Sequence, residues 1–255
     1  MKRARRAAAF TLVELMVVML VVAILAAGLA IPIAAQLQLR RYDEARRQLE
    51  EAREALLGFA SAHGRLPCPA VGSSRGQESF AAAGDAANGA CLDFHSGFLP
   101  AAALGLSPLD DGGFARDPWG TESGRIRYAV ASVTLGTVPH ALTRADGLRA
   151  AGLPALGAAP HFLFVCASGE AATGAGCGPA SQQLTRKAAF VLLSPGPNAS
   201  LPGPAAGDEA RNLDGDAVFV SREASDVPGR VFDDVLLWGS VHQLAHRLVS
   251  AGRLP

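Results

Sequence analysis

Two residue patterns match motifs of known catalytic sites, and neither has the surroundings that its chemistry needs. Residues 72–76 fit the G-x-S-x-G pattern of hydrolases, whose serine lies on a turn between a strand and a helix. Here the pattern follows Pro69 in a stretch rich in turn-forming residues, so that setting is missing. His242 and His246 have the i,i+4 spacing of a zinc protease, but Gln243 replaces the required glutamate. We therefore predict that the chain is not an enzyme.

A run of oxygen-bearing side chains between residues 194 and 218 is a better candidate for a ligand site. Asn212, Asp214 and Asp216 alternate along the chain, and Asp208 precedes them. Calcium takes about six to eight oxygen ligands from carboxylates, amides, carbonyls and water. We expect a calcium site held by these four side chains, with a solvated turn as the alternative. No other cofactor is expected.

The four cysteines of the chain are expected to form disulfide bonds. Cys68, Cys91, Cys166 and Cys177 show no C-x-x-C spacing, which disfavours zinc or redox chemistry. Four cysteines allow three connectivities, and the sequence excludes none of them. Because short loops close most readily, we expect the bonds Cys68–Cys91 and Cys166–Cys177. Such bonds persist outside the cytoplasm.

Glu14 is the only charged residue between Phe10 and Ala35. As a helix this segment is about 39 Å long, enough for a hydrocarbon core of about 30 Å. A carboxylate inside a membrane costs at least about 2.5 kcal/mol, so it needs a partner or a function. The segment is too long for a cleaved secretory signal. We therefore predict a transmembrane helix over residues 10–35.

The charge distribution predicts the orientation of this helix. Four basic residues precede it, namely Lys2, Arg3, Arg5 and Arg6, and positive flanks stay in the cytoplasm. Residues 1–9 therefore form a cytoplasmic leader, and we expect everything after Gln36 to lie on the other side of the membrane. The whole chain has 23 basic and 23 acidic residues and is 49% apolar, which disfavours disorder and nucleic-acid binding.

The elements after the membrane segment predict an α+β fold. Apolar residues recur at steps of three and four, which predicts an amphipathic continuation of the helix over residues 36–63. The stripe consists of Tyr42, Ala45, Leu49, Ala52, Leu56, Phe59 and His63. Gly64 and Pro67 then end the helix. We expect residues 64–255 to form a periplasmic head domain.

Five strand-like runs in this head are separated by turns, which favours an antiparallel sheet packed against the amphipathic helix. They occupy residues 125–133, 161–166, 188–193, 217–221 and 231–238. Ser240 is placed to cap a last helix, which would end near Gly252. Gly-Arg-Leu-Pro occurs at residues 64–67 and again at 252–255, and we expect no repeat around it.

The start of the chain resembles the type IV pilins and the pseudopilins of type II secretion. The resemblance rests on Phe10-Thr11-Leu12-Val13-Glu14 between a basic leader and a long apolar helix. It implies that a prepilin peptidase cleaves between Ala9 and Phe10, that Phe10 is then N-methylated, and that Glu14 acts in assembly. The family has Gly before the cleaved bond, and this chain has Ala9 instead.

Looser similarities in the head point to the major pseudopilin. They are Gly64–Pro67, Gly105-Leu106, Asp117–Gly120 and the Gly- and Asp-rich loop near residues 194–216. In that family a comparable C-terminal loop binds calcium. The two cysteine pairs and the longer C-terminal part do not follow that smaller protein.

The function expected from this resemblance is that of a structural subunit of a type II secretion pseudopilus. Its partners would be other pilin-like subunits, contacted through the N-terminal helix, the prepilin peptidase and the inner-membrane assembly platform. A minor subunit of a type IV pilus is the nearest alternative. An alternative from another class is a signal-anchored periplasmic enzyme or glycan-binding domain that forms no polymer.

Overall fold

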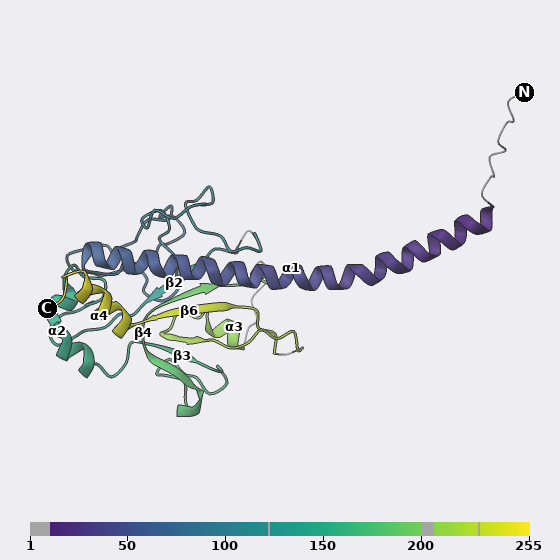
Figure 1. The fold of residues 1–255 in the computed structure, drawn as a ribbon. Coiled ribbons are helices and arrows are strands. Elements are labelled where there is room, and N and C mark those ends of the chain that lie inside the picture. The colour runs from purple at the N-terminus through teal and green to yellow at the C-terminus, as the bar shows by residue number, and fades with distance from the viewer. Residues whose placement is uncertain (1–10, 122, 200–206, 229) are drawn as a thin grey trace, which may run out of the picture. The chain divides into compact units, whose positions relative to one another are not determined.

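The computed structural model describes residues 11–121, 123–199, 207–228 and 230–255, without the side chains of residues 26–35. The chain divides into two compact units, Met1–Asp43 and Glu44–Pro255. Helix α1 (Leu12–His63) contributes to both. We call the second of these the head unit, and Figure 1 labels its elements.

The head unit combines the second half of α1 with a curled sheet and three further helices. In chain order the other elements are β1 (Gly97–Phe98), β2 (Arg127–Val130), α2 (Gly147–Ala158), β3 (Leu163–Cys166), β4 (Gln183–Ser194), α3 (Asp208–Arg211), β5 (Val218–Val220), β6 (Val235–Ser240) and α4 (Val241–Ser250). A short 3-10 turn, η1 (Ala180–Gln182), precedes β4. The α+β class predicted from the sequence is confirmed.

The long strand β4 organises the sheet because it pairs with three other strands. Its first half pairs with β3, and its second half pairs with β2 and β6, all antiparallel. Gly239 of β6 lies opposite Phe190 of β4, and a Cβ there would come within 2.3 Å of the phenyl ring. The close approach of this ring to the β6 backbone therefore requires glycine at position 239.

The prediction of a purely antiparallel sheet is wrong, because β5 runs parallel to β3. The reason is topological. The chain runs along β3, reverses in β4 and reverses again after residue 194, so β5 has the same direction as β3. Strand β6 pairs with β4, whereas β5 joins the sheet beside β3 and forms a parallel pair. Each of the five predicted strand runs does contain a strand.

The predicted stripe of α1 supplies one side of the hydrophobic core. Ala45, Leu49, Ala52 and Leu56 are all at most 1% exposed, as is Ala60. Large side chains of the strands and loops complete the core, among them Leu66, Leu99, Phe114, Tyr128, Phe190 and Phe232. The ends of the predicted stripe differ, since Tyr42 and Phe59 are half-buried and His63 is exposed.

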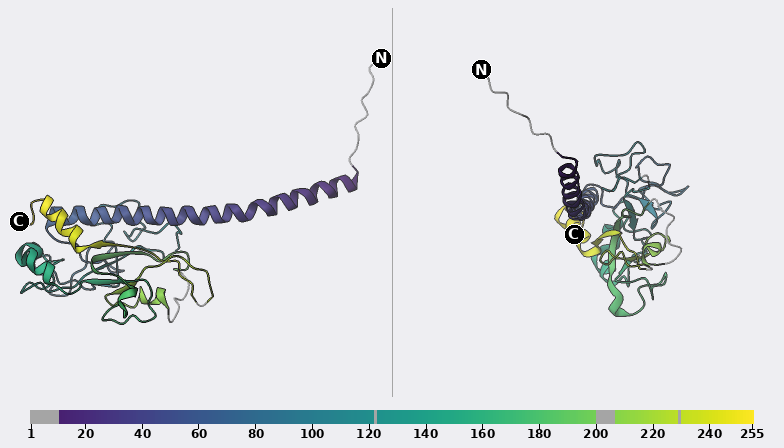
Figure 2. Two further views of the ribbon diagram at one scale, coloured as in Figure 1. Left: turned by 60° about the horizontal axis from the view of Figure 1, so that its bottom comes forward. Right: turned by 90° about the vertical axis from the view of Figure 1, so that its right-hand side faces the viewer.

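Helices α1 and α4 end in the same way. Gly64 and Gly252 each follow the helix with a φ of 68°, a left-handed conformation that glycine adopts without strain. The next residues are Arg and then a buried Leu in each case, so the repeated Gly-Arg-Leu-Pro is used twice as a helix terminator. Figure 2 shows α4 beside the C-terminal end of α1.

Contacts from α4 and its terminator hold the end of α1. The Ser240 hydroxyl accepts the Gln243 N–H at 3.1 Å, so the predicted cap of α4 is confirmed. Arg247 of α4 forms an ion pair with Glu54 of α1. Arg253 donates from Nε to the carbonyl oxygen of Ser61 at 3.0 Å, which satisfies one of the last carbonyls of the helix.

Two disulfide bonds have the local connectivity expected from the sequence, Cys68–Cys91 and Cys166–Cys177. Cys166 and Cys177 join Phe164, Ala172 and Val218 in a small buried cluster at one end of β3. This disulfide therefore closes the loop that leads from β3 to β4.

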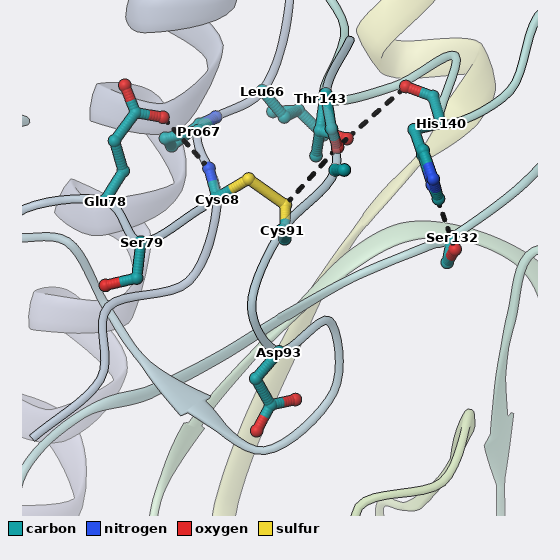
Figure 3. Close-up of a disulfide and its surroundings, with 12 residues drawn as sticks. Leu66, Pro67, Cys68, Glu78, Ser79, Cys91, Asp93, Ser132, His140 and Thr143 are labelled. Carbon is teal, nitrogen blue, oxygen red and sulfur yellow. Dashed lines mark hydrogen bonds between the residues drawn. A yellow bond between two sulfur atoms is a disulfide. The ribbon is translucent and has the colours of Figure 1, made fainter. Parts of the chain in front are cut away.

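A buried ion pair lies next to the first disulfide. Arg65 is 6% exposed and makes two 2.7 Å hydrogen bonds to the carboxylate of Glu78. Its guanidinium carbon lies 5.2 Å from the ring centroid of Phe59 and 5.7 Å from that of Phe80. Glu78 also accepts the backbone N–H of Cys68, as Figure 3 shows. The pair thus joins the end of α1 to the loop closed by the disulfide.

We predict that Arg65→Met destabilises the protein by about 3 kcal/mol, because it leaves the Glu78 carboxylate, which is 19% exposed, without its cation. Methionine keeps most of the apolar stem between the two phenyl rings, so the loss reports on the charge. Urea unfolding of the detergent-solubilised chain, followed by tryptophan fluorescence, measures the effect.

Arg47→Met is the matched control, because Arg47 pairs with Glu44 on an exposed face of α1. An exposed pair contributes at most about 1 kcal/mol. Equal unfolding midpoints for the two variants would show that the buried pair contributes no more than an exposed one.

Candidate functional site

The first turn of α1 is closed by reciprocal hydrogen bonds between Thr11 and Glu14. The Thr11 backbone N–H and hydroxyl each donate to Oε2 of Glu14 at 2.9 Å. In return, the Glu14 backbone N–H donates to the Thr11 hydroxyl oxygen at 3.2 Å. This is a capping box, in which the residue before the helix and the third residue of the helix satisfy each other's backbone N–H groups.

The capping box leaves part of the Glu14 carboxylate available. Both bonds from Thr11 end on Oε2, and among the described residues none donates to Oε1. The side chain is exposed and carries the only charge between residues 11 and 25. Glu14 can therefore cap its own helix and still accept a hydrogen bond from another molecule.

The helix that follows Glu14 is apolar on every side. Its large side chains from Leu12 to Leu25 are between 48% and 70% exposed. A helix that is apolar all round requires an apolar environment on all of its faces. In the single chain no part of the described structure provides one.

The processing residues and part of the predicted membrane segment lie outside the described residues. Ala9 and Phe10 belong to residues 1–10, whose placement is not described, and the side chains of residues 26–35 are not described either. Within the part of the chain that the structure describes, no helix is long and apolar enough to cross a membrane.

The structure gives the four predicted calcium ligands different protein partners. Asp208 forms an ion pair with Arg222 at 2.7 Å. Asn212 is buried, and its amide pairs with the backbone of Val220 and with Asp234. The other two ligands, Asp214 and Asp216, share one partner.

Asp214 and Asp216 both lie against Nη1 of Arg211, at 2.9 and 3.4 Å. Nowhere in the described ranges do three or more His, Cys, Asp or Glu side chains form a group that could hold a metal ion. The arrangement is therefore one cation, Arg211, between two carboxylates.

A second group of acids, which the sequence analysis did not single out, lies beneath this segment. Glu209, Asp233 and Asp234 are each less than 9% exposed. Glu209 accepts the Asp233 N–H at 2.8 Å and the side-chain amide of Asn198 at 2.9 Å. The only sign of this group in the sequence is the adjacent pair of aspartates after Phe232. Two adjacent aspartates by themselves predict an exposed turn.

Burial raises the pKa of the two aspartates of this group. Burial, together with the nearby charge of Glu209, raises the pKa of Asp233 to about 7. Burial also raises the pKa of Asp234 to about 7, although its hydrogen bond from Asn212 acts in the opposite direction. Oδ1 of Asp233 has no hydrogen-bond partner among the described residues. Asp233 and Asp234 are therefore largely protonated in the folded chain at pH values below about 7.

The two catalytic patterns considered in the sequence have no catalytic surroundings in the structure. Residues 72–76 lie in a turn region between α1 and β1, without a preceding strand or a following helix. His242 and His246 lie exposed on the outer face of α4. Neither pattern contributes to a described site.

Comparison with known proteins gives one match, at the N-terminus. Residues 4–30 match the family model of the prokaryotic N-terminal methylation motif. The match includes Ala9, Phe10 and the Thr11–Glu14 capping box. No curated protein and no solved structure is similar enough to the chain to match it.

In metal-free buffer we expect the stability of the chain to fall as the pH rises from about 4 to about 7. Over this range the unfolded chain releases the proton of Asp233, whose ordinary pKa is 3.8, while the folded chain keeps it. One such proton changes the free energy of unfolding by about 1.4 kcal/mol per pH unit. Urea unfolding at several pH values with a chelator present measures the slope.

Asp233→Asn should reduce this slope, because asparagine has no proton to lose. Glu170→Gln is the control, since Glu170 is an exposed carboxylate with no ion pair to any described residue. A slope that is the same in Asp233→Asn and in the original chain would contradict the assignment.

Proposed function

We propose that this type IV pilin-like chain, which carries the prepilin-type methylation signal of pilins and pseudopilins, is a structural subunit of a type II secretion pseudopilus. In this proposal a prepilin peptidase cleaves between Ala9 and Phe10, and Phe10 is N-methylated. The chain is first held in the inner membrane by residues 10–35, with residues 64–255 in the periplasm. The observation that carries the proposal is the methylation motif directly before an apolar helix with a single acid.

The exposed apolar helix supports assembly through that helix. Copies of the same segment, or lipid, supply the apolar surroundings that residues 12–25 lack in the single chain. The inner-membrane assembly platform and other pilin-like subunits are the proposed partners. The head motifs Gly64–Pro67 and Asp117–Gly120 favour the pseudopilus over the alternative, a minor subunit of a type IV pilus.

Glu14 has the properties of an assembly carboxylate. Its Oε1 accepts no hydrogen bond from a described residue, and the cost of an unpaired carboxylate in a membrane favours a cationic partner. Cleavage before Phe10 would create an α-amino group four residues away. In a bundle of axially shifted copies, the amino group of one subunit would neutralise the Glu14 carboxylate of its neighbour.

We predict that Glu14→Gln abolishes or strongly weakens assembly while the helix start stays intact. Glutamine also forms the capping box, so this change removes the charge and little else. Filament yield in a bacterium with an active assembly system, measured by shearing and immunoblotting, provides the readout. Intact mass should show the loss of nine leader residues in the variant and in the original chain, as a control for processing.

Thr11→Ala is the matched variant, because it removes the cap and keeps the carboxylate. It should lower helix stability by about 1 kcal/mol and leave filaments in place. Normal filaments with Glu14→Gln would reject the pairing role. Absence of filaments from the original chain in the same host would favour the rival interpretation, a periplasmic enzyme or glycan-binding domain on a simple anchor. Retention of Met1 in the presence of an active prepilin peptidase would reject the processing step.

We also propose that the segment between residues 194 and 218 binds calcium, with Asp208, Asn212, Asp214 and Asp216 as ligands. The support is that Asp214 and Asp216 already converge on one cationic nitrogen of Arg211, so a cation is favourable there. Asp208 and Asn212 would have to exchange their present partners for the ion.

Millimolar calcium should then raise the melting temperature of the chain at pH 8, since extracellular-type sites bind with dissociation constants of about 10⁻⁴ to 10⁻³ M. Asp214→Ala should remove the shift, and Asp233→Asn should keep it. Loss of the shift in Asp233→Asn alone would assign the ion to the buried acids instead. No shift in the original chain would reject the proposal.

A further inference from the structure

A groove of about 650 Å³ runs along α1 within the head unit. One wall is the α1 face that carries Glu44 and Glu51, and the other is the loop of residues 106–117. Apolar side chains also line the groove, and we call these its floor: Ala52, Leu99, Leu106 and Ile126. The groove therefore combines an apolar floor with charged walls.

The charges on the two walls are not balanced. Glu44 is paired with Arg47, and Asp110 is paired with Arg125 at 2.8 Å and with Arg116 at 3.5 Å. Glu51 of α1 and Asp111 and Asp117 of the loop also line the groove, and none of the three lies within ion-pair distance of a described cation, although Glu51 is near enough to Arg47 to interact with its charge. The groove thus presents carboxylates without an ion pair on both walls, among them the exposed Asp111 and Glu51.

The complementary pattern occurs on the same chain, at residues 37–41 of α1. Leu37, Arg40 and Arg41 have the spacing i, i+3, i+4 and therefore share one face of the helix. Leu37 is 51% exposed, and both arginines are exposed. Neither arginine forms an ion pair with a residue that the structure describes. One apolar side chain is thus flanked by two unpaired cations.

We propose that this groove is an interface between copies of the chain, in which the Leu37–Arg41 face of one copy enters the groove of the next. Leu37 packs on the apolar floor beside Leu109, and the two arginines pair with Glu51 and Asp111. The inference rests on the proposed assembly, which brings many copies of α1 together.

The contact joins two different surfaces, so it is heterologous. A heterologous contact that does not close into a ring generates an open-ended filament. In every pair, the groove of one copy and the Leu37–Arg41 face of the other copy remain free. Further copies can therefore add at both ends. This arrangement is what a subunit of a filament needs from a contact outside its apolar segment.

Cross-linking between two differently tagged full-length copies tests the contact. One copy carries Leu37→Cys and the other Leu109→Cys, and filaments are treated with a short bismaleimide. We expect a mixed dimer that carries both tags. Leu39→Cys is the matched control, because Leu39 is 65% exposed but points to another side of the same helix turn. The pair of Leu39→Cys with Leu109→Cys should give no dimer.

Exchanging the charges on the two sides of the contact provides a second test. Glu51→Arg should lower the yield of the Leu37–Leu109 dimer severalfold, and Arg41→Glu in the partner copy should restore it. Filaments that depend on Glu14 but show no such dimer would overturn the interface and leave the proposed function intact. Equal yields from Leu37→Cys and Leu39→Cys would also overturn it. If no filament forms at all, the interface and the proposed function both fail.

Discussion

The buried face of α1 is the surface on which the head unit is built. Ala45, Leu49, Ala52 and Leu56 point into the core, where the side chains of the strands and of residues 64–130 meet them. The small residues let the surrounding chain approach closely, while the two leucines fill the space between. Gly64 and the contacts from α4 fix the end of this helix. They thereby keep its buried face turned toward the core.

The same helix changes character along its length, and this change separates its two roles. From residue 12 to 25 it is apolar on all sides, whereas from residue 44 onward only one stripe is apolar. An apolar stripe can be covered by the chain itself, but an all-round apolar surface needs lipid or other helices. The first part therefore needs apolar surroundings that the described chain does not supply, and the second part serves the fold.

Some charged groups inside the head unit have a partner of opposite charge, and others do not. Arg65 and Glu78 satisfy each other beside the first disulfide. Asp233 and Asp234 have no comparable cation, and burial raises their pKa instead. Their burial is produced by segments around residues 198, 209 and 212, which are distant in the sequence. No local pattern could have revealed it.

The features that the sequence predicts well are those set by local signals. The Ser240 cap, the Gly64 terminator, the five strand runs and the two short disulfide loops each depend on residues close together in the chain. The parallel pairing of β3 with β5 was missed, because it depends on which edge of the sheet the chain reaches after residue 194. The predicted calcium ligands were chosen by spacing alone, and the structure divides them between Arg211, Arg222 and Val220.

The Cys68–Cys91 bond has a mechanical consequence for a molecule that is held by α1. A tensile load that enters through the helix reaches Cys68 five residues after His63. From there the covalent path of the load crosses the disulfide to Cys91, so residues 69–90 are bypassed and carry no tension. That loop contains Glu78, the partner of Arg65, and it can therefore keep its contact with the end of α1 while the chain is under strain.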